Sequence, residues 1–147
     1  MTETLVVDAS IAIKWVIEED GTPLAVRLRQ NHRFAAPDLL TAECANILWK
    51  KTQRNELTAA EAAMAARLLE RSNIELFGMR SLLTKATEMA ISLGHPAYDC
   101  LYIGLAASHN WRFVTADQRL LRVVQQKAPA KIANLCITLE QAANAPI

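Results

Sequence analysis

Apolar residues recur along the chain with two periods, one typical of buried strands and one typical of amphipathic helices. Short runs rich in Val, Ile, Leu, Phe and Thr, bounded by turn residues, predict strands. Longer stretches with apolar residues three and four positions apart predict helices. The predicted strands are Thr4–Val7, Phe34–Ala36, Ile74–Phe77, Arg112–Thr115 and a last strand within Lys131–Ile137.

Capping residues delimit the predicted helices. Thr58 and Glu61 have the spacing of a capping box, in which each side chain satisfies a backbone donor of the other residue. Thr22 and Asp38 are predicted N-terminal caps, and Gly94 a C-terminal cap. The predicted helices are Ile11–Ile17, Thr22 to about Asn31, Asp38 to about Gln53, Thr58–Arg71, Ser81–Gly94, Ala97–His109, Gln118–Gln126 and a short C-terminal helix.

The order of these elements indicates the fold class. Strands alternate with helices, which favours a three-layer α/β/α sandwich whose parallel sheet is covered on both faces. In such sheets ligands gather at the carboxyl ends of the strands. The chain has 147 residues, 52% of them apolar, and no low-complexity linker interrupts them, so we expect one domain over residues 1–147.

Composition excludes several classes. Sixteen basic and fifteen acidic residues give a net charge of +1, so no global basic field indicates nucleic-acid binding, and phosphate contacts must be local. No apolar run approaches the ~20 residues that span a bilayer, and the N-terminus lacks a signal-peptide pattern, so a soluble, cytoplasmic protein is expected. Cys44, Cys100 and Cys136 are too dispersed for a zinc site and are predicted to be reduced core residues.

Two aspartates follow predicted strands. Asp8 comes directly after Leu5–Val7, and Asp117 comes shortly after the strand that ends at Thr115. Their carboxylates are therefore expected at the carboxyl edge of the sheet, with the hydroxyls of Ser10 and Thr115 beside them as supporting groups. The alternative for each aspartate alone is capping of the following helix, and the hydroxyls would then be ordinary turn residues.

Two further acidic residues occupy mainly apolar helices. Glu43 lies on the apolar side of its helix, one turn before Asn46, which could orient its carboxylate. Asp99 is the sole charged residue in Ala97–Ser108, so its burial would need compensation. The alternatives are a core-edge glutamate hydrogen-bonded to Asn46 and an aspartate that begins a helix.

Taken together, these four carboxylates predict a metal site. If they converge at one edge of the sheet, they carry a formal charge of −4, and like charges held so close require cations. Oxygen ligands suit Mg²⁺, with Mn²⁺ as an alternative, rather than zinc. The predicted ligands and catalytic residues are Asp8, Glu43, Asp99 and Asp117.

The same residues, in this order, carry a resemblance that spans nearly the whole chain. The sequence resembles the PIN-domain nucleases, and its length and layout look like those of the VapC-type toxins of toxin–antitoxin pairs. After Asp117 the chain reads Gln118-Arg119-Leu120-Leu121, where many family members have a further acidic residue or a Phe, so the number of ions, one or two, is left open. The segments that carry the resemblance are Val6-Val-Asp-Ala-Ser10, Pro37–Asn46, Asp99-Cys-Leu-Tyr102 and Val114-Thr-Ala-Asp117.

The resemblance implies a PIN-like sandwich with four or five parallel strands, a homodimer, and an antitoxin partner whose C-terminal segment occupies the active-site groove. It implies an endoribonuclease that hydrolyses RNA through a metal-activated water, without attack by the 2′-hydroxyl. From the number of carboxylates, we expect Asp8, Asp99 and Asp117 to hold one or two Mg²⁺ ions directly, and Glu43 to bind the second ion or position the attacking water.

Two other functions stay open. A strand-terminal aspartate also occurs in phosphoacceptor domains and phosphatases, although Ser10 stands where the usual phosphatase has a second aspartate. An inert PIN-like binding module would use the carboxylates only as caps, with Trp15, Trp49 and the Ala-rich helices as candidate partner surfaces.

The remaining polar residues are assigned no catalytic role. The histidines show no ligand spacing and are predicted to be structural or on the surface, and the scattered basic residues are not assigned to RNA. These residues are His32, His95, His109, Lys14, Arg80, Arg112 and Arg119.

Overall fold

The structure is a computed structural model that describes residues 2–144, so residues 1 and 145–147 of the predicted domain lie outside it. Five strands form one sheet in the order β3-β2-β1-β4-β5, and every neighbouring pair is parallel. The predicted fold class, an α/β/α sandwich with a parallel sheet, is confirmed. The strands are β1 Glu3–Val7, β2 His32–Pro37, β3 Ile74–Phe77, β4 Arg112–Thr115 and β5 Cys136–Thr138.

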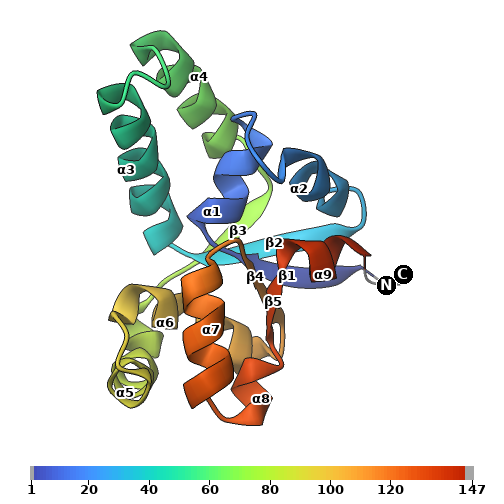
Figure 1. The fold of residues 1–147 in the computed structure, drawn as a ribbon, viewed down its shortest axis with the longest axis vertical. Coiled ribbons are helices and arrows are strands. Elements are labelled where there is room, and N and C mark those ends of the chain that lie inside the picture. Colours follow the sequence, from blue (N-terminus) through green and yellow to red (C-terminus); the bar gives the residue numbers. More distant parts are fainter. Residues whose placement is uncertain (1, 145–147) are drawn as a thin grey trace.

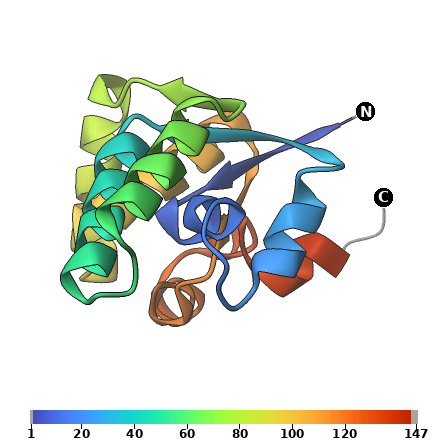
Figure 2. The ribbon, with the colours of Figure 1, turned by 90° about the horizontal axis from the view of Figure 1, so that it is seen from above.

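Helices cover both faces of the sheet (Figure 1). On one face α1, α2 and α9 pack against the sheet, and α3 and α4 rise beside them as a hairpin; on the other lie α5 to α8. Viewed from above, α3 lies beside α4, and α2 beside α9 (Figure 2). The helices are α1 Ala9–Ala12, α2 Thr22–Leu28, α3 Leu39–Gln53, α4 Ala59–Glu70, α5 Leu83–Leu93, α6 Ala97–His109, α7 Gln118–Lys127, α8 Ala130–Ala133 and α9 Leu139–Asn144, with 3-10 turns η1 Ile13–Trp15 and η2 Arg80–Leu82.

Alternation along β1 decides which way the following residue points. Leu5 and Val7 belong to the core under α2 and α9, whereas Val6 belongs to the core that includes Tyr102 of α6. Because side chains alternate between the faces of a strand, the extended residue after Val7 points back to the face covered by α6. That residue is Asp8, with φ −97° and ψ −178°.

Most predicted boundaries agree with the structure to within a few residues. The capping box of Thr58 and Glu61 is present, and Gly94 ends α5 in the left-handed conformation with φ 62°. Asp38 stands at the N-cap of α3, but its side chain makes no capping hydrogen bond. The predicted helix Ile11–Ile17 is instead α1 followed by η1.

The last predicted strand, Lys131–Ile137, overlaps the observed strand but begins five residues too early. Residues Ala130–Ala133 form α8, because Pro129 precedes its first turn and its carbonyl accepts from the backbone N–H groups of Ile132 and Ala133, both at 2.9 Å. The strand is confined to Cys136–Thr138, the residues that pair with β4. None of the helices in the described part of the chain has the length and apolar character that crossing a bilayer requires.

The start of α2 also differs from the prediction. Its N-cap is Gly21, with φ 88°, and not Thr22. The Thr22 hydroxyl is buried and serves the preceding turn instead, accepting from the Glu19 N–H at 3.0 Å and donating to the Ile17 carbonyl at 3.1 Å.

We expect Gly21→Ala to destabilise the protein by about 1–2 kcal/mol, the scale of the penalty for an L-residue in the left-handed region. A Cβ at Gly21 would also lie 3.1 Å from Leu139 Cδ2 of α9. Urea unfolding measures the loss. Gly78→Ala is the control, because a Cβ there meets no atom within 4 Å, and equal effects of the two substitutions would contradict the interpretation.

Candidate active site

Asp8 is the buried centre of the candidate site. Only 6% of its surface is exposed, and both of its carboxylate oxygens accept hydrogen bonds from hydroxyl groups. Ser10 Oγ donates to Oδ1 at 2.5 Å, and Thr115 Oγ1, from the neighbouring strand β4, donates to Oδ2 at 2.5 Å. Asp8 makes no side-chain capping bond to α1, so the capping alternative is wrong for this residue.

The same hydroxyls join the ends of β1 and β4. Ser10 Oγ accepts from the Ala116 N–H at 3.0 Å, and Thr115 Oγ1 accepts from the Asp117 N–H at 3.1 Å. The two strand ends are therefore locked together around the Asp8 carboxylate. This places Ser10 and Thr115 in the supporting positions that the sequence predicts for them.

Glu43 reaches the site from α3. Its Oε1 accepts a hydrogen bond from the Tyr102 hydroxyl of α6 at 2.5 Å, a contact between residues 59 positions apart. Asn46, the predicted partner of Glu43, is exposed, and no hydrogen bond between the two is found within residues 2–144. Tyr102 is fully buried and stacks on Phe113 of β4, so it is a fixed support for the glutamate.

Asp99 lies in the first turn of α6, and its Oδ2 is 2.6 Å from Nε2 of His95. His95 was assigned no role from the sequence, although its spacing of four residues from Asp99 is the spacing at which helical side chains meet. Both side chains are partly buried, with exposed fractions of 14% for His95 and 26% for Asp99.

Asp117 differs from the other three acidic residues. It is exposed, and its Oδ1 accepts from the Leu120 N–H at 3.1 Å, so the capping alternative is confirmed for this residue. Capping and a metal role are compatible, because the cap uses one carboxylate oxygen. The structure links Asp117 to Asp8 through its backbone and Thr115.

Electrostatics connect three of the carboxylates. Burial raises the pKa of Asp8 to about 6, against the opposing effect of its two hydroxyl donors, and the charges of Asp99 and Glu43 raise it further. Burial also raises the pKa of Glu43; the Tyr102 hydroxyl lowers it and the charge of Asp99 raises it. Asp8, Glu43 and Asp99 therefore form one electrostatic cluster at the carboxyl edge of the sheet.

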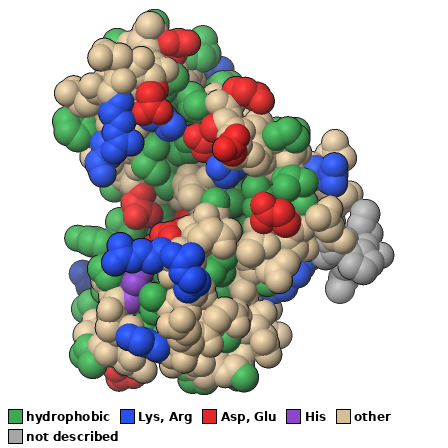
Figure 3. Space-filling model, in the orientation of Figure 1, with side chains coloured by type: hydrophobic (Ala, Val, Ile, Leu, Met, Phe, Trp, Pro, Cys, Tyr) green, Lys and Arg blue, Asp and Glu red, His purple; other side chains and the backbone are tan. Residues whose placement is uncertain are grey.

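The surface over this edge is hollowed between the α3–α4 hairpin and the α5–α7 side of the molecule (Figure 3). Acidic side chains gather in the hollow, and basic side chains lie on its border. Arg112 cannot belong to this border, because it starts β4 at the opposite end of the sheet and pairs with Glu3 at 2.6 Å and 2.8 Å. Arg80 and Arg119 are exposed, whereas Lys14 pairs with Glu19.

The donor set fits a hard divalent cation. Within residues 2–144 no Lys or Arg forms an ion pair with Asp8, Glu43, Asp99 or Asp117, and the one basic side chain in contact with these carboxylates is His95, beside Asp99. Over the same residues, no three His, Cys, Asp or Glu side chains lie close enough together to hold one ion as they stand. The fit to a cation therefore rests on the oxygen chemistry of the carboxylates and on their shared charge.

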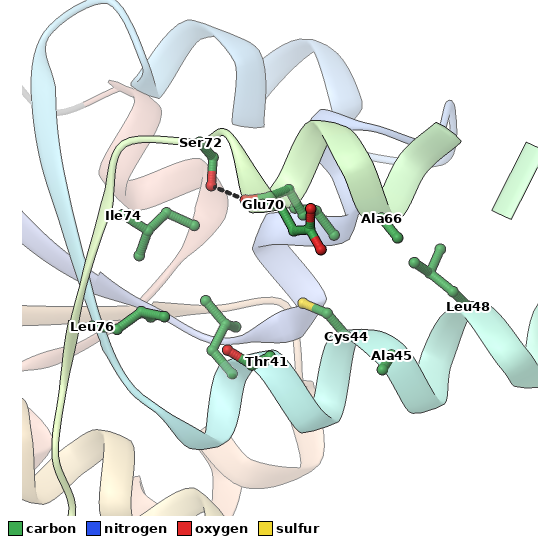
Figure 4. A pocket seen from close by; sticks show the side chains of 11 residues that line it. Thr41, Cys44, Ala45, Leu48, Ala66, Glu70, Ser72, Ile74 and Leu76 are labelled. Atoms are coloured by element: carbon green, nitrogen blue, oxygen red, sulfur yellow. Dashed lines mark hydrogen bonds between the residues drawn. The ribbon is translucent and has the colours of Figure 1, made fainter. Parts of the chain in front are cut away.

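Thiol ligands are excluded by geometry. Cys44 follows Glu43 and Cys100 follows Asp99, and neighbouring residues on a helix point about 100° apart. Cys100 is fully buried in the core, and Cys44 points into a second hollow between α3, α4 and β3 (Figure 4). The cysteines are free and buried, as predicted.

That second hollow is mainly apolar and has a volume of about 360 Å³. It runs along the side of α3 that faces α4, next to the candidate site but not part of it. Its lining residues are Leu40, Thr41, Cys44, Ala45, Leu48, Ala66, Leu69, Glu70, Ser72, Ile74 and Leu76.

Comparison with known proteins identifies the family. The sequence model of the PIN domain matches residues 5–125. The chain belongs to the PIN domain family. Its curated relatives include the VapC ribonuclease Mb0985 of Mycobacterium bovis, 32% identical over 128 residues that cover 87% of this chain and 97% of the relative. Ribonuclease VapC3 of Pyrobaculum aerophilum is 32% identical over 131 residues, with the same coverage.

Solved structures have the same PIN fold. PAE2754 from Pyrobaculum aerophilum aligns with a TM-score of 0.70 at 22% identity, covering 97% of this chain and 87% of that one. VapBC2 from Rickettsia felis, bound to a DNA fragment from its promoter, aligns with a TM-score of 0.58 at 13% identity, covering 92% and 98%. The predicted resemblance to VapC-type PIN domains is confirmed.

The burial of Asp8 predicts a pH-dependent stability for this PIN domain in EDTA. The pKa of Asp8 is about 6 in the folded chain against an ordinary 3.8, so the folded state binds the proton more tightly. The resulting stabilisation is fully present below about pH 4 and is lost as the pH rises through 6. We expect Asp8→Asn to be more stable than the wild type at pH 7.5 by up to about 2–3 kcal/mol, and nearly equal near pH 4.

Urea unfolding at both pH values measures this difference. Asp20→Asn is the control, because Asp20 is exposed in the loop before α2 and its loss should leave the profile unchanged. If Asp8→Asn does not raise the free energy of unfolding at pH 7.5, then the charge of Asp8 does not destabilise the folded protein.

Proposed function

We propose that the chain is a Mg²⁺-dependent endoribonuclease that acts as the toxin of a type II toxin–antitoxin pair, with Mn²⁺ as an alternative ion. The single observation that carries the proposal is the electrostatic cluster of Asp8, Glu43 and Asp99 at the carboxyl edge of the sheet, which no Lys or Arg of the described residues neutralises. The curated relatives are named as VapC ribonucleases, which supports the same function.

Asp8, Asp99 and Asp117 are the proposed ligands, and Glu43 would bind a second ion or hold the attacking water. When bound, the cation supplies charge neutralisation of the phosphate, a lower pKa for water and stabilisation of the leaving oxygen. The chain itself contributes orientation: Ser10 and Thr115 fix the Asp8 carboxylate, and the Tyr102 hydroxyl fixes the Glu43 carboxylate. Asn46 is exposed and makes no hydrogen bond to Glu43 in the described residues, and its supporting role stays a prediction.

The proposed partners are RNA, a cognate antitoxin and a second copy of the chain. The structural similarity to VapBC2, a complex by its name, supports the antitoxin. The apolar groove between the Ala-rich α4 and α3 is a suitable surface for it, and Trp49 nearby on α3 is 56% exposed. Trp15 is less suited, because its indole N–H donates to the Ala25 carbonyl at 2.7 Å and its ring packs on Phe34. We expect the pair to act in the cytoplasm.

Two alternatives are weaker. A phosphoacceptor would use Asp8 as a nucleophile, but Ser10 stands where the usual phosphatase has a second aspartate and the chain belongs to the PIN domain family. An inert binding module would need no unneutralised buried carboxylate. Burying a charge destabilises a folded protein, and ionisable groups with strongly shifted pKa values are therefore found mainly at functional sites.

Asp99→Asn tests the proposal directly. We expect induced expression of the wild type to arrest bacterial growth and cleave cellular RNA, and we expect the variant to lose at least about a hundredfold of the cleavage rate, the scale found when one electrostatic group of an active site is removed. Asp20→Asn, at an exposed position, should cleave like the wild type. EDTA should abolish cleavage and Mg²⁺ restore it. Cleavage that is equal in Asp99→Asn would refute the catalytic role of the cluster, and a trapped aspartyl-phosphate would favour the phosphoacceptor.

The ends of the RNA products test the mechanism. Because water and not the 2′-hydroxyl is the proposed nucleophile, we expect 5′-phosphate and 3′-hydroxyl ends by end-mapping. An oligonucleotide with a single 2′-deoxy residue at the cut should still be cleaved there. Products with 2′,3′-cyclic phosphates would rule out this mechanism while leaving ribonuclease activity in place.

A further inference from the structure

One face of α6, together with the turn before it, carries three polar residues next to the acidic cluster. His95, Asp99 and Tyr102 are spaced at i, i+4 and i+7, which places them on one side of the helix and of the turn before it. Around Asp99 and Tyr102, the middle of that helix from residue 100 to residue 106 is otherwise apolar and mostly buried. Three polar side chains on one side of a mainly apolar segment indicate a shared role.

Contacts other than the one with Asp99 fix the backbone at His95. Gly94 ends α5 in the left-handed conformation, the His95 N–H donates to the Ala90 carbonyl at 3.1 Å, and Pro96 follows. The imidazole of His95 is largely buried, with 14% exposed. Its Nε2 therefore has a defined position, 2.6 Å from Asp99 Oδ2.

The chemistry of the two groups fixes the direction of this bond. An ionised carboxylate has no hydrogen to donate, so Nε2 of His95 must carry the proton and donate it. The bond uses Oδ2 of Asp99 and leaves Oδ1 available. Within residues 2–144, Oδ1 has no other hydrogen-bond partner.

Tyr102 does the same for Glu43. Its hydroxyl donates to Oε1 at 2.5 Å and leaves Oε2 available. Burial, the hydrogen bond to Glu43 and the nearby carboxylate charges all raise the pKa of Tyr102, so the phenol stays protonated and remains a donor. Its ring is locked against Phe113, at a centroid distance of 5.8 Å.

We propose that His95 and Tyr102 are positioning residues that each fix one oxygen of a metal-binding carboxylate, Asp99 and Glu43 respectively, and so leave the other oxygen directed to a divalent cation. This inference rests on the proposed metal-dependent function. Partners of this kind orient ligating carboxylates in metal sites, and their loss typically weakens metal binding by about ten- to a hundredfold. This face thus supplies one proposed ligand, Asp99, and the two side chains that hold Asp99 and Glu43 in place, His95 and Tyr102.

Mn²⁺ binding by the purified full chain tests the inference without RNA. We expect His95→Ala and Tyr102→Phe to raise the Kd for Mn²⁺, measured by electron paramagnetic resonance, by about ten- to a hundredfold. His95→Gln should recover part of the affinity, because its amide N–H₂ can still donate to Asp99. The matched controls are His109→Gln and Tyr98→Phe, residues of the same helix; His109 stacks on Trp111 and Tyr98 is 64% exposed.

RNA cleavage then separates positioning from folding. The metal concentration that gives half-maximal cleavage should rise in His95→Ala and Tyr102→Phe, and saturating Mn²⁺ should restore most of the wild-type rate. Circular dichroism should show both variants folded, and if His95→Ala does not fold, Tyr102→Phe and His95→Gln still decide the matter. Nitrogen-15 shifts of His95 should show a protonated Nε2 at neutral pH.

Several outcomes would overturn the inference: an unchanged Kd in folded variants, an equal loss in the control variants, an unprotonated Nε2, or a wild type that binds no Mn²⁺ at millimolar concentration. A different result would contradict the proposed ribonuclease function alone. If the wild type binds Mn²⁺ and the variants weaken that binding, but no RNA is cut, then the positioning roles stand and the ribonuclease proposal fails.

Discussion

The carboxylate of Asp8, buried at the carboxyl end of the central strand, is the constraint around which the rest of the site is arranged. Burial disfavours its ionised form, and two nearby acidic groups increase this effect. The charge can be kept there only because the adjacent strand supplies Thr115 and the following helix supplies Ser10, each at 2.5 Å. The parallel pairing of β1 with β4 is thus as much a requirement of the site as of the sheet.

The strands and the aspartates that follow them could be predicted from the sequence. An apolar run that stops at Asp8 places a carboxylate at the end of a strand, and parallel pairing places Thr115 beside it. Asp99 was identifiable because its helix is otherwise uncharged, and the structure explains that pattern: α6 is packed against the sheet on one side and α5 on the other. A charge on a helix buried in this way must have a partner.

The supporting contacts were harder to predict. Tyr102 and Glu43 lie 59 positions apart, and an aromatic residue on an apolar helix has the same periodic signal whether it fills the core or binds a carboxylate. The sequence favours Asn46 as the partner of Glu43 because the two residues are one helical turn apart. Side chains one turn apart can still point away from each other, and here Asn46 is exposed to solvent whereas Glu43 is partly buried. The spacing of four residues between His95 and Asp99 did carry a signal, but a search for metal-ligand spacing overlooks it because His95 contacts Asp99 and forms no group of ligands with other residues.

Hydrogen bonding and charge balance are separate demands, and this site meets only the first from its own chain. Every buried side-chain nitrogen or oxygen atom in the described residues has a hydrogen-bond partner. Hydroxyl and phenol donors, however, stabilise a carboxylate without cancelling its charge, and no Lys or Arg in residues 2–144 pairs with the cluster. A protein that only needed these carboxylates as structural groups would gain stability by pairing them with a basic side chain or replacing them. Carboxylates that are fixed by hydrogen bonds and yet not paired with a lysine or arginine are what a site requires if its cation is to come from solution.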